Sequence, residues 1–182
     1  MCGIIGYVGP QEACPILVGG LGRLEYRGYD SAGIATTSVN GRIEIRRAVG
    51  KLKNLRRLVE ESPLAGKIGI GHTRWATHGR PSEENAHPHK AGPVAVIHNG
   101  IVENYVELRG ALLKRNHRLR SETDTELIAH LIEERIKEGL GLTKAVLASV
   151  RELRGSFSIV VMAETEPDKL VAAKTATKTK AS

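Results

Sequence analysis

Aromatic side chains are scarce in this chain of 182 residues, which has four tyrosines, one tryptophan and one phenylalanine. Since 41% of the residues are hydrophobic, the core must be built from aliphatic side chains, and a chain of this size can bury about 70% of its unfolded surface. Few rings remain on which nucleic-acid bases could stack. Although the formal net charge is +7, the basic residues are largely interspersed with acids, so nucleic acid is not an expected partner.

Long hydrophobic runs are also lacking. The longest apolar stretches, such as 94–97 and 156–163, have the length of a strand, whereas a membrane span needs about 20 apolar residues. The N-terminus has neither the basic nor the apolar region of a signal peptide. Two cysteines, Cys2 and Cys14, do not form a disulfide framework. These absences predict a cytoplasmic protein without a membrane partner.

Hydrophobic periodicity predicts about five helices and seven or eight strands, mixed in order. The expected helices span 10–22, 51–61, 105–115, 125–137 and 142–153. The expected strands span 2–8, 33–38, 42–49, 67–73, 94–98, 157–163 and 170–173. The segment 75–93 has no periodicity, and such a long irregular segment is typical of a functional loop. Residues 174–182 carry no large apolar side chain and are expected to form a disordered basic tail.

The N-terminus reads Met1-Cys2-Gly3. Removal of the initiator Met would leave Cys2 with both a thiol and a free α-amine. The thiolate is a nucleophile, and an α-amine, with an ordinary pKa of about 7.7–8.0, can act as a base near neutral pH. One residue could then supply both groups. From this dipeptide alone, a small buried side chain is the simpler interpretation, as it is for Cys14 on the first helix.

Two further segments offer groups for a polar substrate. Asn99 and Gly100 follow an expected strand, where an amide and a glycine N–H could form an oxyanion hole. The same dipeptide is also a common turn. Asp124 stands at the start of an expected helix, where its carboxylate could receive an ammonium group or could cap the helix.

A fourth segment, at the end of the expected strand 67–73, carries Arg74, Trp75, Thr77 and His78. The guanidinium of Arg74 could pair bidentately with a carboxylate. The hydroxyl of Thr77 and the ring of His78 could add hydrogen bonds. An ordinary surface loop with an ion pair would have the same composition.

Five of the seven histidines lie between residues 72 and 98 and could suggest a metal site. They are His72, His78, His87, His89 and His98. Imidazole is a common zinc ligand, but the His-x-His spacing across Pro88 matches no helical ligand pair, and no cysteine or clustered carboxylate accompanies it. Neither a metal nor another cofactor is expected.

Six motifs follow one another along the chain. They are MCGIIG from Met1, LEYRGYDSAG from Leu24, HTRWATHG from His72, NAHPH from Asn85, HNGI from His98 and SETDT from Ser121. Together they resemble the class II glutamine amidotransferases, and most specifically the glutaminase domain of the glucosamine-6-phosphate synthase family (glutamine–fructose-6-phosphate aminotransferases). The resemblance covers residues 1–173.

This resemblance implies an α+β, N-terminal-nucleophile hydrolase fold, a four-layer αββα sandwich with two mainly antiparallel sheets between helical layers. It also implies that Cys2 is the nucleophile and that its freed amine is the base. Asn99 and the N–H of Gly100 would form the oxyanion hole. The implied reaction is hydrolysis of L-glutamine to glutamate and ammonia through a glutamyl thioester.

The resemblance also implies how glutamine is bound. Arg74, with Thr77 and His78, would hold the α-carboxylate, and Asp124, with the backbone of Gly100, would receive the α-ammonium. A lid would run from residue 74 to about residue 81. The remaining implied roles are a gate toward an ammonia channel, Trp75, and a residue that organises the active site, Arg27.

In this family the chain continues into a sugar-phosphate isomerase domain, which has no counterpart in this sequence. The sequence is therefore expected to hydrolyse glutamine without isomerase activity. An alternative is a weakly active regulatory or interaction module that pairs with a separate sugar isomerase chain. The expected partner is thus L-glutamine, and the alternative adds such an isomerase chain.

Overall fold

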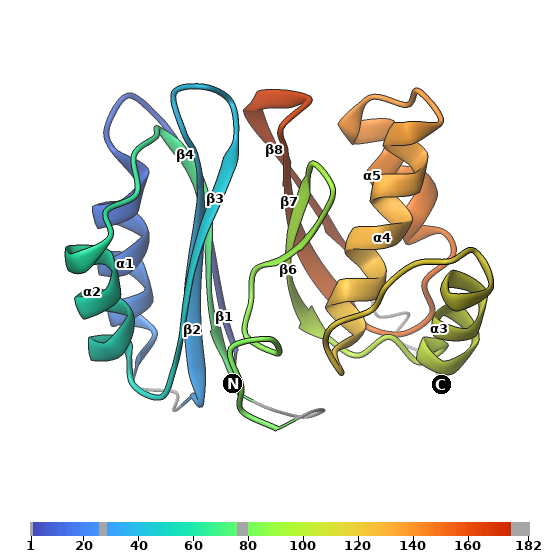
Figure 1. The fold of residues 1–182 in the computed structure, drawn as a ribbon, viewed down its shortest axis with the longest axis horizontal. Coiled ribbons are helices and arrows are strands. Elements are labelled where there is room, and N and C mark those ends of the chain that lie inside the picture. Colours follow the sequence, from blue (N-terminus) through green and yellow to red (C-terminus); the bar gives the residue numbers. More distant parts are fainter. Residues whose placement is uncertain (1, 26–28, 76–79, 176–182) are drawn as a thin grey trace, which may run out of the picture.

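The computed structural model describes residues 2–25, 29–75 and 80–175. Within these ranges the chain forms two four-stranded sheets that face each other, and helices cover the outer side of each sheet (Figure 1). Every neighbouring pair of strands is antiparallel. The four-layer αββα sandwich expected from the resemblance is therefore confirmed.

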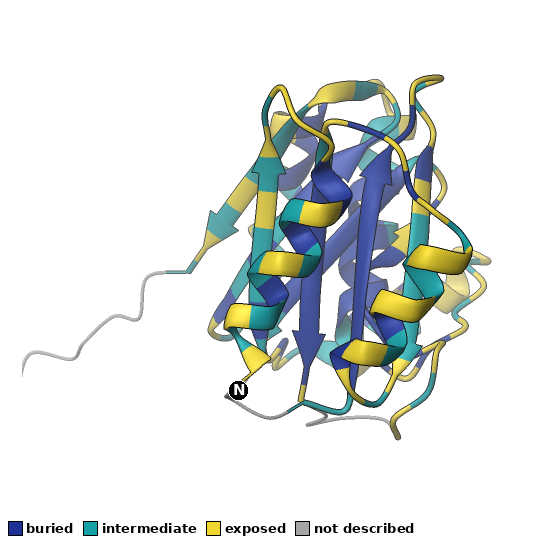
Figure 2. Cartoon of the chain, turned by 90° about the vertical axis from the view of Figure 1, so that its left-hand side faces the viewer, coloured by how far each residue is buried: buried dark blue, intermediate teal, exposed yellow. Residues whose placement is uncertain are grey.

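The first sheet has the strand order β1-β4-β2-β3. Its strands are β1 (Gly3–Val8), β2 (Ser31–Thr37), β3 (Ile43–Val49) and β4 (Ile68–Arg74). Helices α1 (Ala13–Arg23) and α2 (Leu52–Glu61) pack on its outer side, and their exposed residues face away from the buried strands (Figure 2). Ile34 packs against these helices and Ala35 against the second sheet, because successive side chains of a strand point to opposite faces.

The second sheet has the order β5-β6-β7-β8. Its strands are β5 (His89–Ala91), β6 (Val94–Gly100), β7 (Phe157–Ala163) and β8 (Glu166–Lys174). Helices α4 (Asp124–Lys137) and α5 (Leu142–Val150) contact this sheet, and α3 (Tyr105–Lys114) packs against α4. The longest helix in the described ranges, α4, has 14 residues, and none of these helices is both long and apolar enough to span a membrane.

The core has three layers, one beneath each helical layer and one between the sheets. The layer between the sheets contains Ala35, Ile43, Ile70, Ala95, Ile97 and Met162. The largest fully buried side chains are all Leu or Ile, each of which stabilises the fold by about 1.5–3 kcal/mol on burial. The prediction of an aliphatic core is thus confirmed.

The prediction that 75–93 is irregular is wrong at its end, where β5 pairs with β6 through His89 and Val96. The strand is hard to predict because histidine is a polar residue that is typical of loops. Here His89 and Ala91 are buried while Lys90 is exposed, which is the alternation of a half-buried strand.

The last strand also differs from the prediction, which began it at residue 170 and placed a turn at Pro167. Instead β8 begins at Glu166. A strand at the edge of a sheet tolerates proline because one side of its backbone has no ladder bond to donate. At its far end Lys174 pairs with Ser158, and the Thr175 hydroxyl accepts a hydrogen bond from the Phe157 N–H at 2.9 Å. Residues 176–182 of the expected tail lie outside the described residues.

Candidate active site

The sequence-predicted site residues meet at one end of the sandwich. Cys2 directly precedes β1, and Gly3 pairs with Thr73 near the end of β4. Because the two strands are antiparallel, the start of β1 lies beside Arg74, the last residue of β4. Strand β6 of the facing sheet ends at Gly100 and also contacts β1 (Figure 1).

The sulfur of Cys2 is held against the residue that follows β4. The backbone N–H of Trp75 donates to Sγ at 3.1 Å, and Sγ lies 3.6 Å from the carbonyl oxygen of the same residue. The next residue, Gly3, donates its N–H to the Thr73 hydroxyl at 3.1 Å. These contacts fix the half-buried thiol, while the Trp75 side chain itself is 52% exposed.

The side chain of Asn99 bridges Cys2 and a buried histidine. Its Nδ2 donates to the Cys2 carbonyl oxygen at 3.1 Å, and its Oδ1 lies 2.9 Å from Nε2 of His72. The same Nε2 lies 3.0 Å from the carbonyl oxygen of His98. Both neighbours are acceptors, so we assign the proton of the His72 ring to Nε2. His72 thereby points the amide nitrogen of Asn99 toward the nucleophile, and this nitrogen has a second proton for another acceptor.

Gly100 and Asp124 complete this end of the sandwich. Gly100 has a φ of +128° and a Cβ at this position would lie 2.1 Å from the carbonyl oxygen of Ser156, so only glycine fits. Asp124 is the first residue of α4. Its Oδ2 accepts a hydrogen bond from the Val102 N–H at 3.0 Å, and its Oδ1 lies 3.3 Å from Nδ1 of His98. The carboxylate is thereby held beside the segment that follows Gly100.

The guanidinium of Arg74 is buried, with 4% of the residue exposed. Its Nη1 lies 3.5 Å from Oδ1 of Asp30. Three other predicted site residues, Arg27, Thr77 and His78, lie outside the described residues. The structure thus brings Cys2, Asn99, Gly100, Arg74 and Asp124 to one end and adds two residues to which the sequence assigned no role, Asp30 and His72.

The histidines between residues 72 and 98 form hydrogen bonds rather than a chelating group within the described residues. The ring of His87 stacks on that of His72 at 4.1 Å and its Nε2 lies 2.7 Å from the Thr125 hydroxyl. His89 contacts the Thr123 hydroxyl at 3.0 Å. Burial lowers the pKa of His72 to about 4 and that of His89 to about 3, and it places the pKa of His87 well below its usual value. All three rings are therefore neutral at pH 7.

This buried network predicts that acid destabilises the fold before the carboxylates titrate. The unfolded chain protonates these three rings near pH 6.5 and the folded chain keeps them neutral. Below that pH the unfolded state therefore binds more protons than the folded state. As the pH is lowered, the free energy of unfolding decreases by up to about 1.4 kcal/mol per pH unit for each histidine. Urea unfolding between pH 7 and pH 5 measures this slope.

A matched variant assigns the slope to the buried rings. His89→Gln removes one of the three depressed pKa values. It should therefore lower the slope of the free energy of unfolding against pH by the contribution of one proton, about 1.4 kcal/mol per pH unit, whatever its effect on stability at pH 7. A free energy of unfolding that stays constant between pH 7 and pH 5 would contradict the assignment.

Comparisons with known proteins agree with this geometry. A sequence profile described as the glutamine amidotransferase domain matches residues 72–179. The glutamine–fructose-6-phosphate aminotransferase (isomerizing) of Gluconobacter oxydans is 51% identical over 174 residues, which are 96% of this chain and 29% of that protein. The protein of the same name from Pyrococcus horikoshii is 52% identical, again over 96% of this chain and 29% of its own length. This chain thus spans under a third of these relatives.

A solved structure extends the likeness to the fold. The glutamine phosphoribosylpyrophosphate amidotransferase of B. subtilis superposes with a TM-score of 0.81 at 28% identity, covering 96% of this chain and 37% of that one. A superposition over nearly the whole of this chain supports the same arrangement of two facing sheets in both proteins. The chain therefore belongs to the class II glutamine amidotransferase domain family and has the N-terminal-nucleophile hydrolase fold.

Proposed function

We propose that this chain hydrolyses L-glutamine to glutamate and ammonia, with Cys2 as the nucleophile. The observation that carries the proposal is the convergence at one end of the sandwich of the Cys2 sulfur and the Asn99 amide, with Gly100 beside them. A thiol next to amide donors is suited to acyl transfer. Membership of the glutamine amidotransferase family names the acyl donor.

Removal of Met1, before any reaction takes place, frees the α-amine of Cys2. This amine takes the thiol proton, and the thiolate attacks the side-chain carbonyl carbon of glutamine. The carbonyl oxygen becomes an oxyanion that accepts hydrogen bonds from the second amide proton of Asn99 and from the N–H of Gly100. His72 acts as a positioning residue because it fixes which end of the Asn99 amide faces the nucleophile.

The tetrahedral intermediate collapses when its C–N bond breaks. The ammonium form of the Cys2 amine gives its proton to the leaving nitrogen, which departs as ammonia and leaves a glutamyl thioester. Water, deprotonated by the same amine, then attacks the thioester carbon and its C–S bond breaks. Glutamate leaves and the thiol of Cys2 regains its proton.

The polar groups around the nucleophile match an α-amino acid. We propose that Arg74, with Thr77 and His78, binds the α-carboxylate of glutamine. The carboxylate of Asp124, held by the Val102 N–H and His98, binds the α-ammonium together with the backbone of Gly100. Two further roles follow from the resemblance, a gate for ammonia, Trp75, and a residue that organises the site, Arg27.

The names of the relatives, which specify transfer to fructose 6-phosphate with isomerization, support a proposal for the physiological role. We propose that ammonia from this domain serves amino-sugar synthesis by a sugar isomerase domain or chain that pairs with residues 1–173. We also propose a cytoplasmic location, because a reducing compartment keeps a nucleophilic thiol free of disulfides. Both described cysteines are unpaired thiols.

A steady-state assay of the full chain tests the activity. Protein whose N-terminal mass confirms loss of Met1 should release glutamate and ammonia in equal amounts from glutamine. Asn99→Ala should lower kcat by about 10²–10³-fold with a smaller change in KM, because it removes an oxyanion donor.

The matched control is Asn54→Ala on α2, which removes a half-buried amide whose Nδ2 donates to the Val49 carbonyl oxygen at 2.8 Å. This variant should retain the parent kcat. A change in KM alone for Asn99→Ala would contradict its oxyanion role, and absence of glutaminase activity in trimmed protein would overturn the proposed function.

A further inference from the structure

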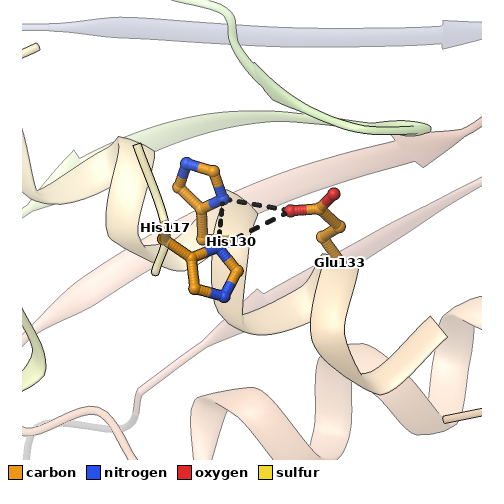
Figure 3. Close-up of side chains that lie close together, drawn as sticks. All are labelled: His117, His130 and Glu133. Carbon is orange, nitrogen blue, oxygen red and sulfur yellow. Dashed lines mark hydrogen bonds and ion pairs between the residues drawn. The ribbon is translucent and has the colours of Figure 1, made fainter. Parts of the chain in front are cut away.

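Three side chains of the kinds that bind metal ions lie close together on α4 and on the segment that precedes it. His117 comes from the segment after α3, and His130 and Glu133 stand three residues apart on α4, so they share one face of that helix. All three side chains point toward one another (Figure 3). Their potential ligand atoms all lie within 4.8 Å of one another, and among the described residues no other set of three His, Cys, Asp or Glu side chains does so.

We propose that His117 Nδ1, His130 Nδ1 and Glu133 Oε2 bind a divalent transition-metal ion of the zinc class. The two ring nitrogens are 3.0 Å apart, and the carboxylate oxygen lies 3.0 Å from His130 and 4.0 Å from His117. Ligand atoms of a tetrahedral zinc ion at about 2.0–2.1 Å lie about 3.3 Å from one another, so the spacing needs only small adjustments. Two histidines and one glutamate form an established zinc ligand set.

The neighbouring residues orient the ligand atoms. Nε2 of His117 lies 2.7 Å from Glu134 Oε1, a carboxylate that also accepts from Arg115 Nε at 3.1 Å. A carboxylate can only accept here, so it fixes the proton on Nε2 and turns the lone pair of Nδ1 toward the other ligands. On the opposite side Lys137 binds Oε1 of Glu133 at 2.7 Å and leaves Oε2 for the centre.

The competing occupant of this centre is a proton. Without metal, His130 Nδ1–H is shared between Glu133 Oε2 and the lone pair of His117 Nδ1. Metal binding replaces this shared proton at the centre. The proposal departs from the expectation of no metal, which rested on the spacing of histidines between residues 72 and 98.

The surroundings of the centre are mixed in charge. His117, His130 and Glu133 line a pocket of about 480 Å³ together with four cations and one further carboxylate, namely Lys90, Arg118, Arg120, Lys137 and Glu126. Three protein ligands leave a fourth position of a tetrahedral ion unfilled. The cations that line the pocket favour water, hydroxide or an anion as the fourth ligand.

Metal titration of the chelator-treated full chain tests the proposal, with ZnCl₂ measured by calorimetry and no glutamine present. One equivalent should bind, and His130→Gln should weaken binding by at least about 100-fold, while Glu134→Gln should weaken it by about 10–100-fold. Glu138→Gln removes an exposed carboxylate at the end of the same helix and should change nothing. Zinc at 100 times Kd should raise Tm by about 5–10 °C.

CoCl₂ separates this centre from the thiol of Cys2. Cobalt in a His-His-Glu site should give the visible bands of a four-coordinate ion without a thiolate charge-transfer band, before and after alkylation of Cys2. A thiolate band, no binding at one equivalent, or parent affinity in His130→Gln would overturn the proposal. Glu133→Gln keeps the shape of the side chain and repeats the test if His130→Gln fails to fold. None of these readouts depends on glutaminase activity.

Discussion

Replacing Cys2 with alanine is expected to abolish glutamine hydrolysis. The variant keeps the carbonyl oxygen of residue 2, which accepts a hydrogen bond from Nδ2 of Asn99, and it keeps the α-amine, but it has no sulfur to attack the substrate. Loss of an enzyme's nucleophile costs about 10⁴-fold or more in kcat. Release of ammonia from glutamine, measured together with glutamate, gives the result directly.

The second cysteine provides the matched control. Cys14 is 6% exposed on α1, and burial raises the pKa of its thiol, so the group stays protonated and unreactive. Cys14→Ala should therefore retain kcat and lose only packing. Glutaminase activity retained in Cys2→Ala, or lost in a folded Cys14→Ala, would contradict the assignment of the nucleophile.

Several helices and strands could be predicted because their signals are local, whereas the αββα fold and the roles of the site residues followed from the resemblance of six motifs to a known family. Strand β7 matches the prediction of 157–163 at both ends, since it is a continuous apolar run bounded by polar residues and glycine. The Met-Cys-Gly start and the Asn-Gly pair mark chemistry through residues that are adjacent in sequence. The antiparallel pairing of Gly3 with Thr73 then brings the nucleophile beside the end of β4.

Contacts between distant residues could not be predicted in the same way. The bond from His72 to Asn99 joins residues of two different sheets, and a histidine in a strand does not by itself indicate its partner. The same holds for His117, which reaches His130 and Glu133 from another segment. The three-residue spacing of His130 and Glu133 on one helix face is a usable signal, although the histidines that stand out in the sequence are those between residues 72 and 98.

Gly100→Ala tests whether the end of β6 has the shape that the oxyanion hole needs. Its new Cβ would lie 2.1 Å from the carbonyl oxygen of Ser156 and 2.7 Å from the Cα of Phe157. Both are backbone atoms of the adjoining chain segment, so the contact cannot be relieved by a side-chain rotation. The φ of +128° adds strain for any residue with a Cβ. Together these effects should destabilise the fold by about 2–5 kcal/mol.

The same substitution should reduce glutaminase activity more than its loss of folded protein explains. The strand must move away from Ser156, which displaces the N–H of Gly100 from the oxyanion, and the loss of one such donor costs about 10²–10³-fold in kcat. Gly110→Ala is the matched control, because Gly110 lies inside α3 and nothing lies within 4 Å of an added Cβ.

The control should gain stability, by about 0.5–1 kcal/mol, since alanine is the better helix former. Gly110→Ala should also keep the parent kcat, so a fall in kcat per folded molecule that is seen only for Gly100→Ala assigns the loss to the backbone of residue 100. Parent kcat in folded Gly100→Ala would show that the N–H of residue 100 does not stabilise the oxyanion, and would leave Asn99 as the donor that must account for it.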